Sequence, residues 1–553
     1  MTTKLISRLL LVFTFISSSI LSIAQDLSKG EIHGNFESTV QSYKEDSLIN
    51  APAVSEKVLM NAFTNINYTN GNFAAGIRYE SYLNPLLGFD PRYKGSGIAY
   101  KYATYKANEL EITVGNYYEQ FGSGLIFRSY EERGLGIDNA MNGLRLKYNP
   151  SKGIYLKGII GKQRFFFDEG EGIIRGVDGD IDLNEAIPMF TNAKTKVIIG
   201  GSFVSKFQKD ADPKYVLPEN VASYGGRINL TCGKFGLLSE YAYKINDPSS
   251  ANNFIYKPGE ALLVTASFSQ KKGLGLILSA KRTDNMSYHS SRTETGNALI
   301  MNYLPALTRQ HVYTLSAMYP YASQANGEMA FQGDLMYKIQ KGTLLGGKYG
   351  TSIAVNYSRA NNIEKTQIND TILIDTKGTM GYKSDFFAIG KEKYFEDINV
   401  EISKKVSSKF KFLLSYLNQV YNKSVIQGNK SYGTVYSDIV ILDMSYKIKP
   451  THALRLELQH LSTKQDYGAW GMGLLEYTIA PKWFFTVMDQ YNYGNKHVDK
   501  RIHYMNCAIG FTKNSNRFQL GYGKQREGII CVGGVCRNVP ASNGFTLTIT
   551  SSF

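Results

Sequence analysis

The sequence is short of cysteine and tryptophan, and beyond its first residues it lacks long apolar runs. Only four of its 553 residues are cysteine and two are tryptophan. After Ala24 there is no uninterrupted apolar stretch of the length a spanning helix needs, so we expect no transmembrane helix there. The motifs GxSxG and HExxH are absent and the seven histidines are scattered, which argues against an enzyme. Nothing resembles a basic reading helix, so nucleic acid is not an expected partner.

The first 24 residues have the features of a secretory signal peptide. Lys4 and Arg8 precede an apolar stretch from Leu9 to Ile20, and small residues stand at the minus-three and minus-one positions of a cleavage site after Ala24. The apolar stretch is shorter than the ~20 residues of a spanning helix, so cleavage is favoured over a retained anchor. No cysteine follows it, which argues against a lipoprotein. We therefore expect residues 25–553 to be exported.

Aromatic residues are plentiful and follow a period of two. The chain has 39 tyrosines and 29 phenylalanines. Its last residues place Phe545, Leu547, Ile549 and Phe553 on one parity and threonine or serine on the other, as in a β-strand with one apolar face. A terminal aromatic on such a strand is typical of outer-membrane barrels. A large soluble all-β protein would share this composition, so the pattern along the chain has to decide.

Hairpins with one apolar and one polar face recur along the chain. In residues 59–82, two alternating segments flank Asn70-Gly71, a pair suited to the positive φ angles of a tight turn. In residues 453–461, three leucines alternate with Arg455, Glu457 and a glutamine. An apolar face opposite a charged face suits a barrel with lipid outside and polar contacts inside.

The whole exported chain fits one large antiparallel transmembrane β-barrel. We count about 24 segments, and 22 to 26 strands satisfy the even number expected of bacterial barrels. Turns such as VSSK, IAPK and TKNSN alternate with longer connections, which predicts that both termini are periplasmic. The alternation fails between Arg282 and Arg309. There, either a strand is miscounted or residues 297–310 form a short helix.

Four segments resemble a known family. They are EQFGSGLIFRSYEERGLGIDNAMNG, YLPALTRQHVYTLSAMYPYASQANGE, REGIICVGGVCRNVPASNGFTLTITSSF and NPLLGFDPRYKGSGIAYKYATYK. Together they resemble a family of large Bacteroidota outer-membrane β-barrel proteins of unknown function. The resemblance covers nearly all of the exported chain. It implies the fold and the location, and it brings no catalytic or binding residues.

The glycine-rich segment from Phe121 to Asn139 is a candidate pore constriction. A barrel of more than about 20 strands has a lumen wide enough to need a plug or a partner. An inward fold would place acidic and basic groups across the pore, as in solute-selective porins. The alternative is an ordinary extracellular loop with solvated ion pairs. The candidate constriction residues are Arg128, Glu131, Glu132, Arg133 and Asp138.

Positions predicted to face the lumen carry both signs of charge. A strongly anion-selective pore should show one sign, so we favour a paired and hydrogen-bonded interior that stiffens the barrel. Loss of Lys4 and Arg8 lowers the net charge from +15 to +13. We expect this surplus on turns and loops, where it could meet lipopolysaccharide phosphates. The predicted lumen charges are Arg78, Glu80, Lys101, Glu111, Arg145, Lys157, Arg227, Glu240, Glu328, Asp334, Arg455 and Glu457.

The segment VDGDIDLNE is a candidate calcium site. Asp178, Asp180 and Asp182 stand at alternate positions and supply the hard oxygen ligands that calcium prefers. The glycine of an EF-hand loop is Leu183 here, which weakens this interpretation. In the alternative, Asp182 caps a short helix and Glu185 closes a capping box. No other cofactor is expected.

The four cysteines divide into one close pair and two isolated residues. In an oxidising compartment, Cys531 and Cys536, with a glycine pair between them, are expected to form a disulfide in the last long loop. Two ligands without a nearby histidine cannot fill a tetrahedral metal site, and the CxxC spacing of redox motifs is absent. Cys232 and Cys507 fall in predicted strands, and we expect free thiols there.

Two functions of different class fit these features. One is a passive or partner-gated channel that acts as a transport component. The other is a non-conducting scaffold or accessory subunit of an outer-membrane export or assembly complex. The expected surroundings are outer-membrane lipid and lipopolysaccharide, with other outer-membrane proteins or lipoproteins as partners. Whether the lumen is open or filled would distinguish the two functions, because a channel needs a path for its solute and a scaffold does not.

Overall fold

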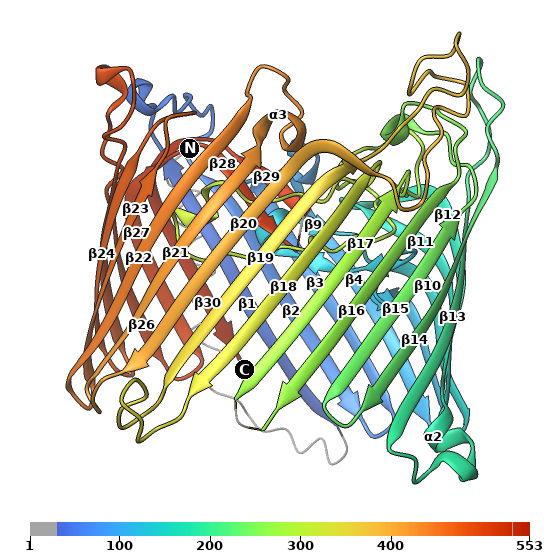
Figure 1. Ribbon diagram of the computed structural model, residues 1–553, viewed down its shortest axis with the longest axis horizontal. Helices are drawn as coiled ribbons and strands as arrows, with labels where there is room; N and C mark the ends of the chain where they lie inside the picture. Colours follow the sequence, from blue (N-terminus) through green and yellow to red (C-terminus); the bar gives the residue numbers. More distant parts are fainter. Residues whose placement is uncertain (1–29, 272, 534) are drawn as a thin grey trace.

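The chain forms a closed barrel of 24 antiparallel strands (Figure 1), the number predicted from the sequence. The computed structural model describes residues 30–271, 273–533 and 535–553, so the predicted signal peptide lies outside the described residues. β1 pairs with β30 and closes the barrel. The barrel strands are β1 (Glu31–Tyr43), β2 (Leu59–Asn70), β3 (Phe73–Asn84), β4 (Gly95–Ala107), β5 (Leu110–Tyr117), β10 (Met141–Ser151), β11 (Ile154–Phe165), β12 (Asp168–Asp182), β13 (Thr195–Phe207), β14 (Asn220–Cys232), β15 (Phe235–Lys244), β16 (Gly259–Gln270), β17 (Leu274–Asp284), β18 (Glu328–Ile339), β19 (Thr351–Ile363), β20 (Ile389–Lys405), β21 (Phe410–Asn422), β22 (Thr434–Lys449), β23 (His452–Ser462), β24 (Trp470–Ile479), β25 (Trp483–Tyr491), β26 (Asn506–Lys513), β27 (Asn516–Gln525) and β30 (Ser542–Ser552).

The remaining elements are short. Three two-stranded hairpins are separate from the barrel wall: β6 (Glu119–Gln120) with β7 (Arg128–Ser129), β8 (Glu131–Glu132) with β9 (Ile137–Asp138), and β28 (Gly528–Val532) with β29 (Val535–Val539). The described α-helices are α2 (Leu183–Ala186) and α3 (Lys423–Ile426). The 3-10 turns are η1 (Ser47–Ile49), η2 (Pro91–Tyr93), η3 (Arg133–Leu135), η4 (Pro188–Phe190), η5 (Ser250–Asn252), η6 (Ser316–Met318) and η7 (Val498–Lys500). Within the described ranges, no helix is long and apolar enough to cross a membrane.

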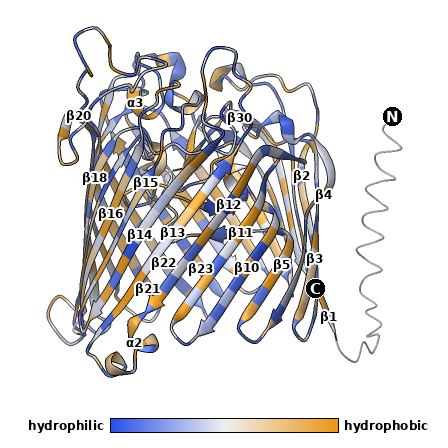
Figure 2. Cartoon of the chain, turned by 90° about the vertical axis from the view of Figure 1, so that its right-hand side faces the viewer, coloured by the Kyte–Doolittle hydropathy of each residue, from blue (hydrophilic) through white to orange (hydrophobic). Residues whose placement is uncertain are grey.

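Alternation along each strand separates an outer apolar face from a lumen face. On β23, Leu458 is 43% exposed on the outside, whereas its neighbour Glu457 is 4% exposed in the lumen. Figure 2 shows hydrophobic and hydrophilic residues in turn along the strands. The hairpin of β2 and β3 turns at Gly71 and Asn72, between the partners Asn70 and Phe73. This turn lies one residue later than predicted, and Gly71 supplies the positive φ of 55°.

The two ends of the barrel differ in their connections. At one end, which we call the turn end, most connections are short, and VSSK, IAPK and TKNSN lie there as predicted. β1 begins and β30 ends at the turn end, where the amide of Gly34 donates to the carbonyl of Phe553. The opposite end, the loop end, carries the long connections and lies at the top of Figure 1.

Two long connections fold into the lumen and fill its loop-end half. We call residues 118–140, between β5 and β10, the inner loop, and residues 285–327, between β17 and β18, the strap. Their apolar side chains join those of the wall in one core. On β22, lumen-facing residues are buried from Val435 to Ile441, half-buried at Asp443 and exposed at Lys447. The lumen is therefore filled near the loop end and accessible to solvent near the turn end. The core residues contributed by the two segments are Phe121, Leu125, Ile126, Phe127, Met286, Tyr288, Met301, Leu304, Leu307, Leu315, Met318, Tyr319 and Tyr321.

The strap explains why the sequence-based alternation fails before Arg309. Residues 297–310 hold no helix, so the predicted helix is wrong. Their backbone is satisfied by side chains of the wall and the inner loop instead. Asn139 and Gln163 both donate to the carbonyl of Ile300 at 2.8 Å, and Lys281 donates to that of Pro305. Such partners let an irregular segment be buried.

Candidate functional site: the closed lumen

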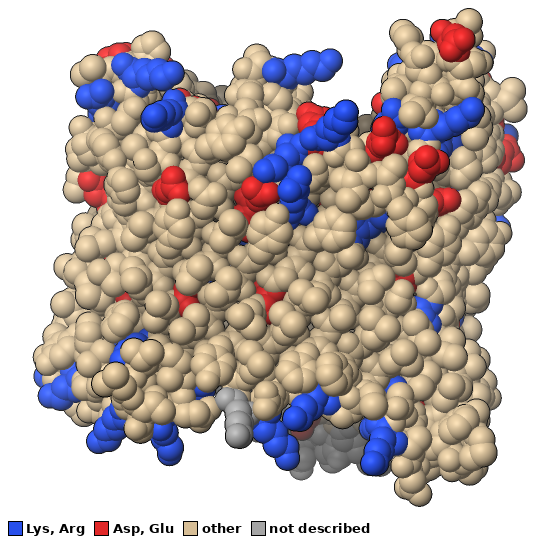
Figure 3. Space-filling view, in the orientation of Figure 1, with Lys and Arg blue, Asp and Glu red and all other residues tan. Residues whose placement is uncertain are grey.

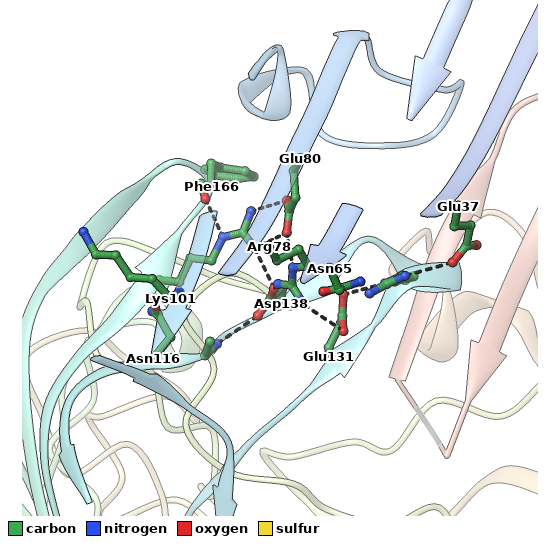
Figure 4. Close-up of polar contacts among 12 residues, drawn as sticks. Glu37, Asn65, Arg78, Glu80, Lys101, Asn116, Glu131, Asp138 and Phe166 are labelled. Atoms are coloured by element: carbon green, nitrogen blue, oxygen red, sulfur yellow. Dashed lines mark hydrogen bonds and ion pairs between the residues drawn. The ribbon is translucent and has the colours of Figure 1, made fainter. Parts of the chain in front are cut away.

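An ion-pair network holds the inner loop against β3 and β11. Arg78 Nε lies 2.7 Å from Glu80 Oε1 on the wall, and Arg78 Nη1 lies 3.0 Å from Glu131 Oε2 of the inner loop. Arg164 Nη1 lies 2.6 Å from Asp138 Oδ2, which also contacts Arg78. Figure 4 shows Asp138 and Glu131 of the inner loop beside Arg78, with Glu80 on its other side. Both arginine side chains are only 4% exposed, so the network is desolvated and each charge needs its partners.

The other predicted constriction residues also lie in the inner loop and are engaged there. Arg133 bridges Glu131 at 2.7 Å and Glu37 of β1 at 2.8 Å. Glu132 accepts from the amide of Gly134 and caps η3. Arg128 stacks on the rings of Tyr130 and Tyr303, at 4.4 and 4.1 Å. The segment is therefore part of the lumen filling: Glu131, Arg133 and Asp138 form ion pairs with the wall or with each other, whereas Arg128 stacks on aromatic rings and Glu132 caps η3.

Most of the predicted lumen charges lie on the inner wall and have partners. Arg145 lies 2.7 Å from Glu111, Arg455 lies 3.0 Å from Asp443, and Arg455 also contacts Glu457. The remaining contacts of this set are Lys157 with Glu119, Arg227 with Asp178 and Asp180, Glu240 with the amide of Ser123, Lys281 with Glu328, and Asp334 with Gln332 and Asn356.

Lys101 is the exception, because it is exposed and does not share the lumen face of its strand. The pairing of β3 with β4 shifts register between Arg78 with Tyr100 and Tyr79 with Ile98. The extra residue, Ala99, is a β-bulge, which reverses the parity of the residues that follow. Tyr100, under Arg78, faces the lumen, and Lys101 therefore faces out.

The three candidate calcium ligands are held by donors of the chain itself. Arg227 Nη1 lies 2.8 Å from Asp178 and its Nη2 lies 2.7 Å from Asp180. Asp182 caps α2 and accepts from the amides of Asn184 and Glu185, which is the capping role predicted as the alternative. Among the described residues, no group of three or more His, Cys, Asp or Glu side chains is placed to hold a metal ion. A calcium ion here stays a prediction.

Three buried lysines on β13, β15 and β17 hold the near part of the strap to the wall. Lys206 of β13 donates to the carbonyl of His289 at 2.7 Å and lies 2.8 Å from Asp247. Lys281 of β17 lies 2.8 Å from Glu328, and neither side chain is exposed. Lys244 of β15 donates to a strap carbonyl at Ser287. Sequence reasoning missed these lysines, although each shares the lumen parity at the loop end of its strand.

Polar groups further round the wall, from β20 onwards, hold the far part of the strap. Arg309 Nη2 lies 2.7 Å from Glu401 of β20. His311 contacts Asp397 of the same strand through Nε2. Further along, the remaining contacts are Tyr313 with Asp443, the amide of Leu315 with Gln459, and Tyr319 with Asp466. The strap thus spans the lumen between β11–β13, which hold its near part, and β20–β23, which hold its far part.

Burial changes the titration of His289 in the strap. His289 is enclosed near Lys206 and Asp247, and its Nε2 lies 3.1 Å from the carbonyl oxygen of Gly296. Desolvation by burial lowers the pKa of His289 to about 4. The imidazole is therefore neutral at pH 7, and its protonation would place a further charge beside two buried lysines.

The hairpin of β28 and β29 covers the strap from the loop end. Cys531 and Cys536 form the predicted disulfide, with their Cα atoms 4.1 Å apart. The hydroxyl of Tyr303 donates to the carbonyl of Gly533 at 2.9 Å, and Asn297 donates to that of Cys536 at 2.9 Å. The staple therefore stiffens a segment that rests on the strap. Cys232 and Cys507 are free and exposed, as expected.

The chain belongs to a family of unknown function, DUF6029, whose profile matches residues 2–553. No curated protein matches the sequence. Among solved structures, it is similar to the siderophore receptor PirA from Pseudomonas aeruginosa, with a TM-score of 0.42, 9% identity, and coverage of 95% of this chain and 80% of that one. It is also similar to OccAB3 from Acinetobacter baumannii, with a TM-score of 0.33, 10% identity, and coverage of 95% and 98%. A third similar structure is that of the copper transporter OprC, with a TM-score of 0.38, 9% identity, and coverage of 95% of this chain and 80% of that one.

Proposed function

We propose that the protein is an outer-membrane channel held closed by its own lumen segments, and that displacement of the strap opens it. The observation that carries this proposal is the attachment of the strap. The far part of the strap contacts β20 through two pairs, Arg309 with Glu401 and His311 with Asp397. Both are contacts between polar side chains, and water can take the place of either partner when the strap undocks. Polar contacts of this kind can exchange between a docked and an undocked state more readily than an apolar core can.

The outer surface supports the location in an outer membrane. The barrel strands expose apolar side chains such as Ile77, Val177, Leu278 and Val440 at 43–58% of their area. Because a closed barrel satisfies its own backbone hydrogen bonds, this surface can face lipid. In this location the turn end is periplasmic and the loop end extracellular, surrounded by phospholipid and lipopolysaccharide. Export would depend on the predicted signal peptide.

Conductance across a planar bilayer tests the proposal. We expect the wild-type protein to be mostly closed, and the variant Asp397→Asn/Glu401→Gln to open in bursts, because two of the polar contacts that hold the far part of the strap are weakened. The matched control is Asp489→Asn, which removes a carboxylate from an exposed pair with His503 and should leave the protein closed. Hydrogen exchange of residues 305–320 reports whether the strap is released. A released strap without any conductance would contradict the proposal.

The buried core favours a second candidate, a non-conducting scaffold or accessory subunit. Phe121, Leu125, Ile126 and Phe127 of the inner loop are fully buried and pack with strap residues in one core. A permanent core of this kind would suit a barrel that only carries partners, such as lipoproteins or other outer-membrane proteins. The bilayer experiment separates the candidates, because a scaffold stays closed even when the strap is released.

A further inference from the structure

Five consecutive connections at the turn end, from β18 round to β27, carry basic residues and no acidic ones. The segments concerned are 338–352, 403–412, 445–453, 478–484 and 511–518. Figure 3 shows Lys and Arg gathered along the lower edge of the face drawn, whereas the upper edge carries both signs. The surplus charge is therefore concentrated at the turn end and is not spread evenly over turns and loops. Its members are Lys338, Lys341, Lys348, Lys404, Lys405, Lys409, Lys411, Lys447, Lys449, Lys482, Lys513 and Arg517.

These cations differ from the charges deeper in the lumen. Within the described part of the chain, none of the twelve forms an ion pair with a carboxylate. Lys405 lies over the ring of Tyr349 at 4.6 Å and Arg517 over that of Phe484 at 5.0 Å. The nearest lumen-facing carboxylates on β20 and β22, Glu401 and Asp443, are already paired. The positive charge at this mouth is therefore not neutralised by the fold.

Three of these lysines share the lumen face. On β20, Lys405 has the parity of Asp397, which is buried in the lumen. Lys411 of β21 is its direct cross-strand partner. Lys411 is in turn opposite Ser445 of β22, which places Lys447 diagonally beside it. Like charges directly opposite each other destabilise a sheet, and the described contacts offer this row no carboxylate to offset the cost. We call Lys405, Lys411 and Lys447 the mouth row.

We infer that the mouth row attracts small anionic solutes into the turn-end mouth of the lumen. One sign of charge on a concave wall of low dielectric focuses the field and raises the local concentration of the opposite ion. The sequence-based expectation of a mixed lumen describes the closed part of the barrel, where the charges pair. The mouth row, on β20 to β22, has a single sign. The inference rests on the proposed function, because a selective mouth matters for a solute that enters the lumen.

The local potential can be measured without opening the channel. In a Cys232→Ser/Cys507→Ser background, Ser403→Cys adds one exposed thiol on the lumen face, two residues from Lys405. The thiol is modified separately with the anionic reagent sulfonatoethyl methanethiosulfonate and the cationic reagent trimethylammonioethyl methanethiosulfonate. The measured quantity is the rate with the anionic reagent divided by the rate with the cationic one, normalised to the same ratio for a free thiol in solution. We expect a ratio about tenfold above that of the free thiol, and a fall of about tenfold in Lys405→Gln/Lys411→Gln/Lys447→Gln. The ratio should also shrink at 1 M salt.

The matched control removes the same charge elsewhere on the turn end. Lys152, Lys234 and Lys513 are exposed and lie outside the mouth row. Changing all three to Gln should alter the ratio by less than about twofold, because screening confines the effect of distant charges. An unchanged ratio in the mouth-row variant, or an equal fall in the control, would overturn the inference. A channel that never conducts would contradict the proposed function and leave this ratio unaffected.

Discussion

Arg164 of β11 and Glu80 of β3 form a two-point ion pair inside the barrel, although 84 residues separate them in the chain. Nη1 lies 2.8 Å from Oε1 and Nη2 lies 2.6 Å from Oε2. Arg164 reaches Asp138 of the inner loop at the same time. One guanidinium thus joins the inner loop to two strands that are not neighbours in the barrel.

Removal of Arg164 should loosen the inner loop and leave the barrel wall intact. In Arg164→Met, Glu80 and Asp138 keep their ion pairs with Arg78, and Asp138 keeps the hydroxyl of Tyr118 and the amide of Ala140, but each carboxylate loses one buried cation. Loss of a buried charged partner costs about 3–5 kcal/mol. We expect faster amide exchange in residues 118–140 and little change in the strands. The control is Lys94→Met, which breaks an exposed pair with Glu56 worth at most about 1 kcal/mol. Exchange equal to wild type in the inner loop would contradict the role of Arg164.

Acidification should release the strap near His289. The folded-state pKa of His289, about 4, lies below the value of an unfolded histidine. The undocked strap therefore binds the proton more readily, so docking is strongest above about pH 6.5 and weakens as the pH falls towards 4, by up to about 3 kcal/mol. Amide exchange of residues 285–300, corrected for its intrinsic pH dependence, measures this. In His289→Gln the pH dependence should largely disappear, and its persistence would assign the effect to other groups.

Reduction of the disulfide should free the hairpin of β28 and β29. Opening this small ring raises the entropy of the displaced segment and costs about 2 kcal/mol of local stability. The contact of Gly533 with Tyr303 would weaken, so we expect faster exchange in residues 526–541 and greater mobility of the strap around Tyr303. The melting temperature of the barrel should stay the same, because the hairpin lies outside the wall. Cys531→Ser/Cys536→Ser should reproduce the effect without reductant, and a lowered barrel melting temperature would show that the staple supports the wall.

The barrel wall could be predicted from the sequence because its signals are local. Alternation of apolar and polar residues within one strand, as at Leu458 and Glu457, predicts which face of the barrel each residue occupies. The short turns between strands allow the strands to be counted. Where a bulge adds a residue, the parity reverses. Lys101 was assigned to the wrong face for this reason, since nothing in the sequence marks Ala99 as the extra residue.

The lumen filling could be predicted only in part because its contacts are distant. The inner loop could be recognised from its glycines and charges, but its partners Arg78 and Arg164 lie on other strands. The strap has no periodic pattern, and Lys206 and Lys281 hold it by its carbonyl groups, which every residue has. A sequence cannot state which carbonyl a buried lysine meets.

A single added methyl group at Gly172 should displace the strap. Gly172 lies on β12, and a Cβ built there would come within 2.1 Å of the carbonyl oxygen of Ser290, which belongs to the strap backbone. Neither backbone can move far without breaking its own contacts, because Lys206 holds the neighbouring carbonyl of His289. Overpacking of this kind costs about 1–3 kcal/mol. We therefore expect Gly172→Ala to raise amide exchange in residues 285–300 and the frequency of channel openings.

The chain offers a matched control for this substitution. A Cβ at Gly158, on the adjacent strand β11, would meet no atom within 4 Å. Gly158→Ala makes the same chemical change in the same part of the wall, and its smaller backbone entropy in the unfolded chain should leave the barrel as stable as wild type or slightly more so. Increased exchange of the strap in both variants would mean that alanine disturbs the wall. An effect in Gly172→Ala alone ties the closed lumen to the contact between β12 and Ser290, because the two variants differ only in what their methyl groups meet.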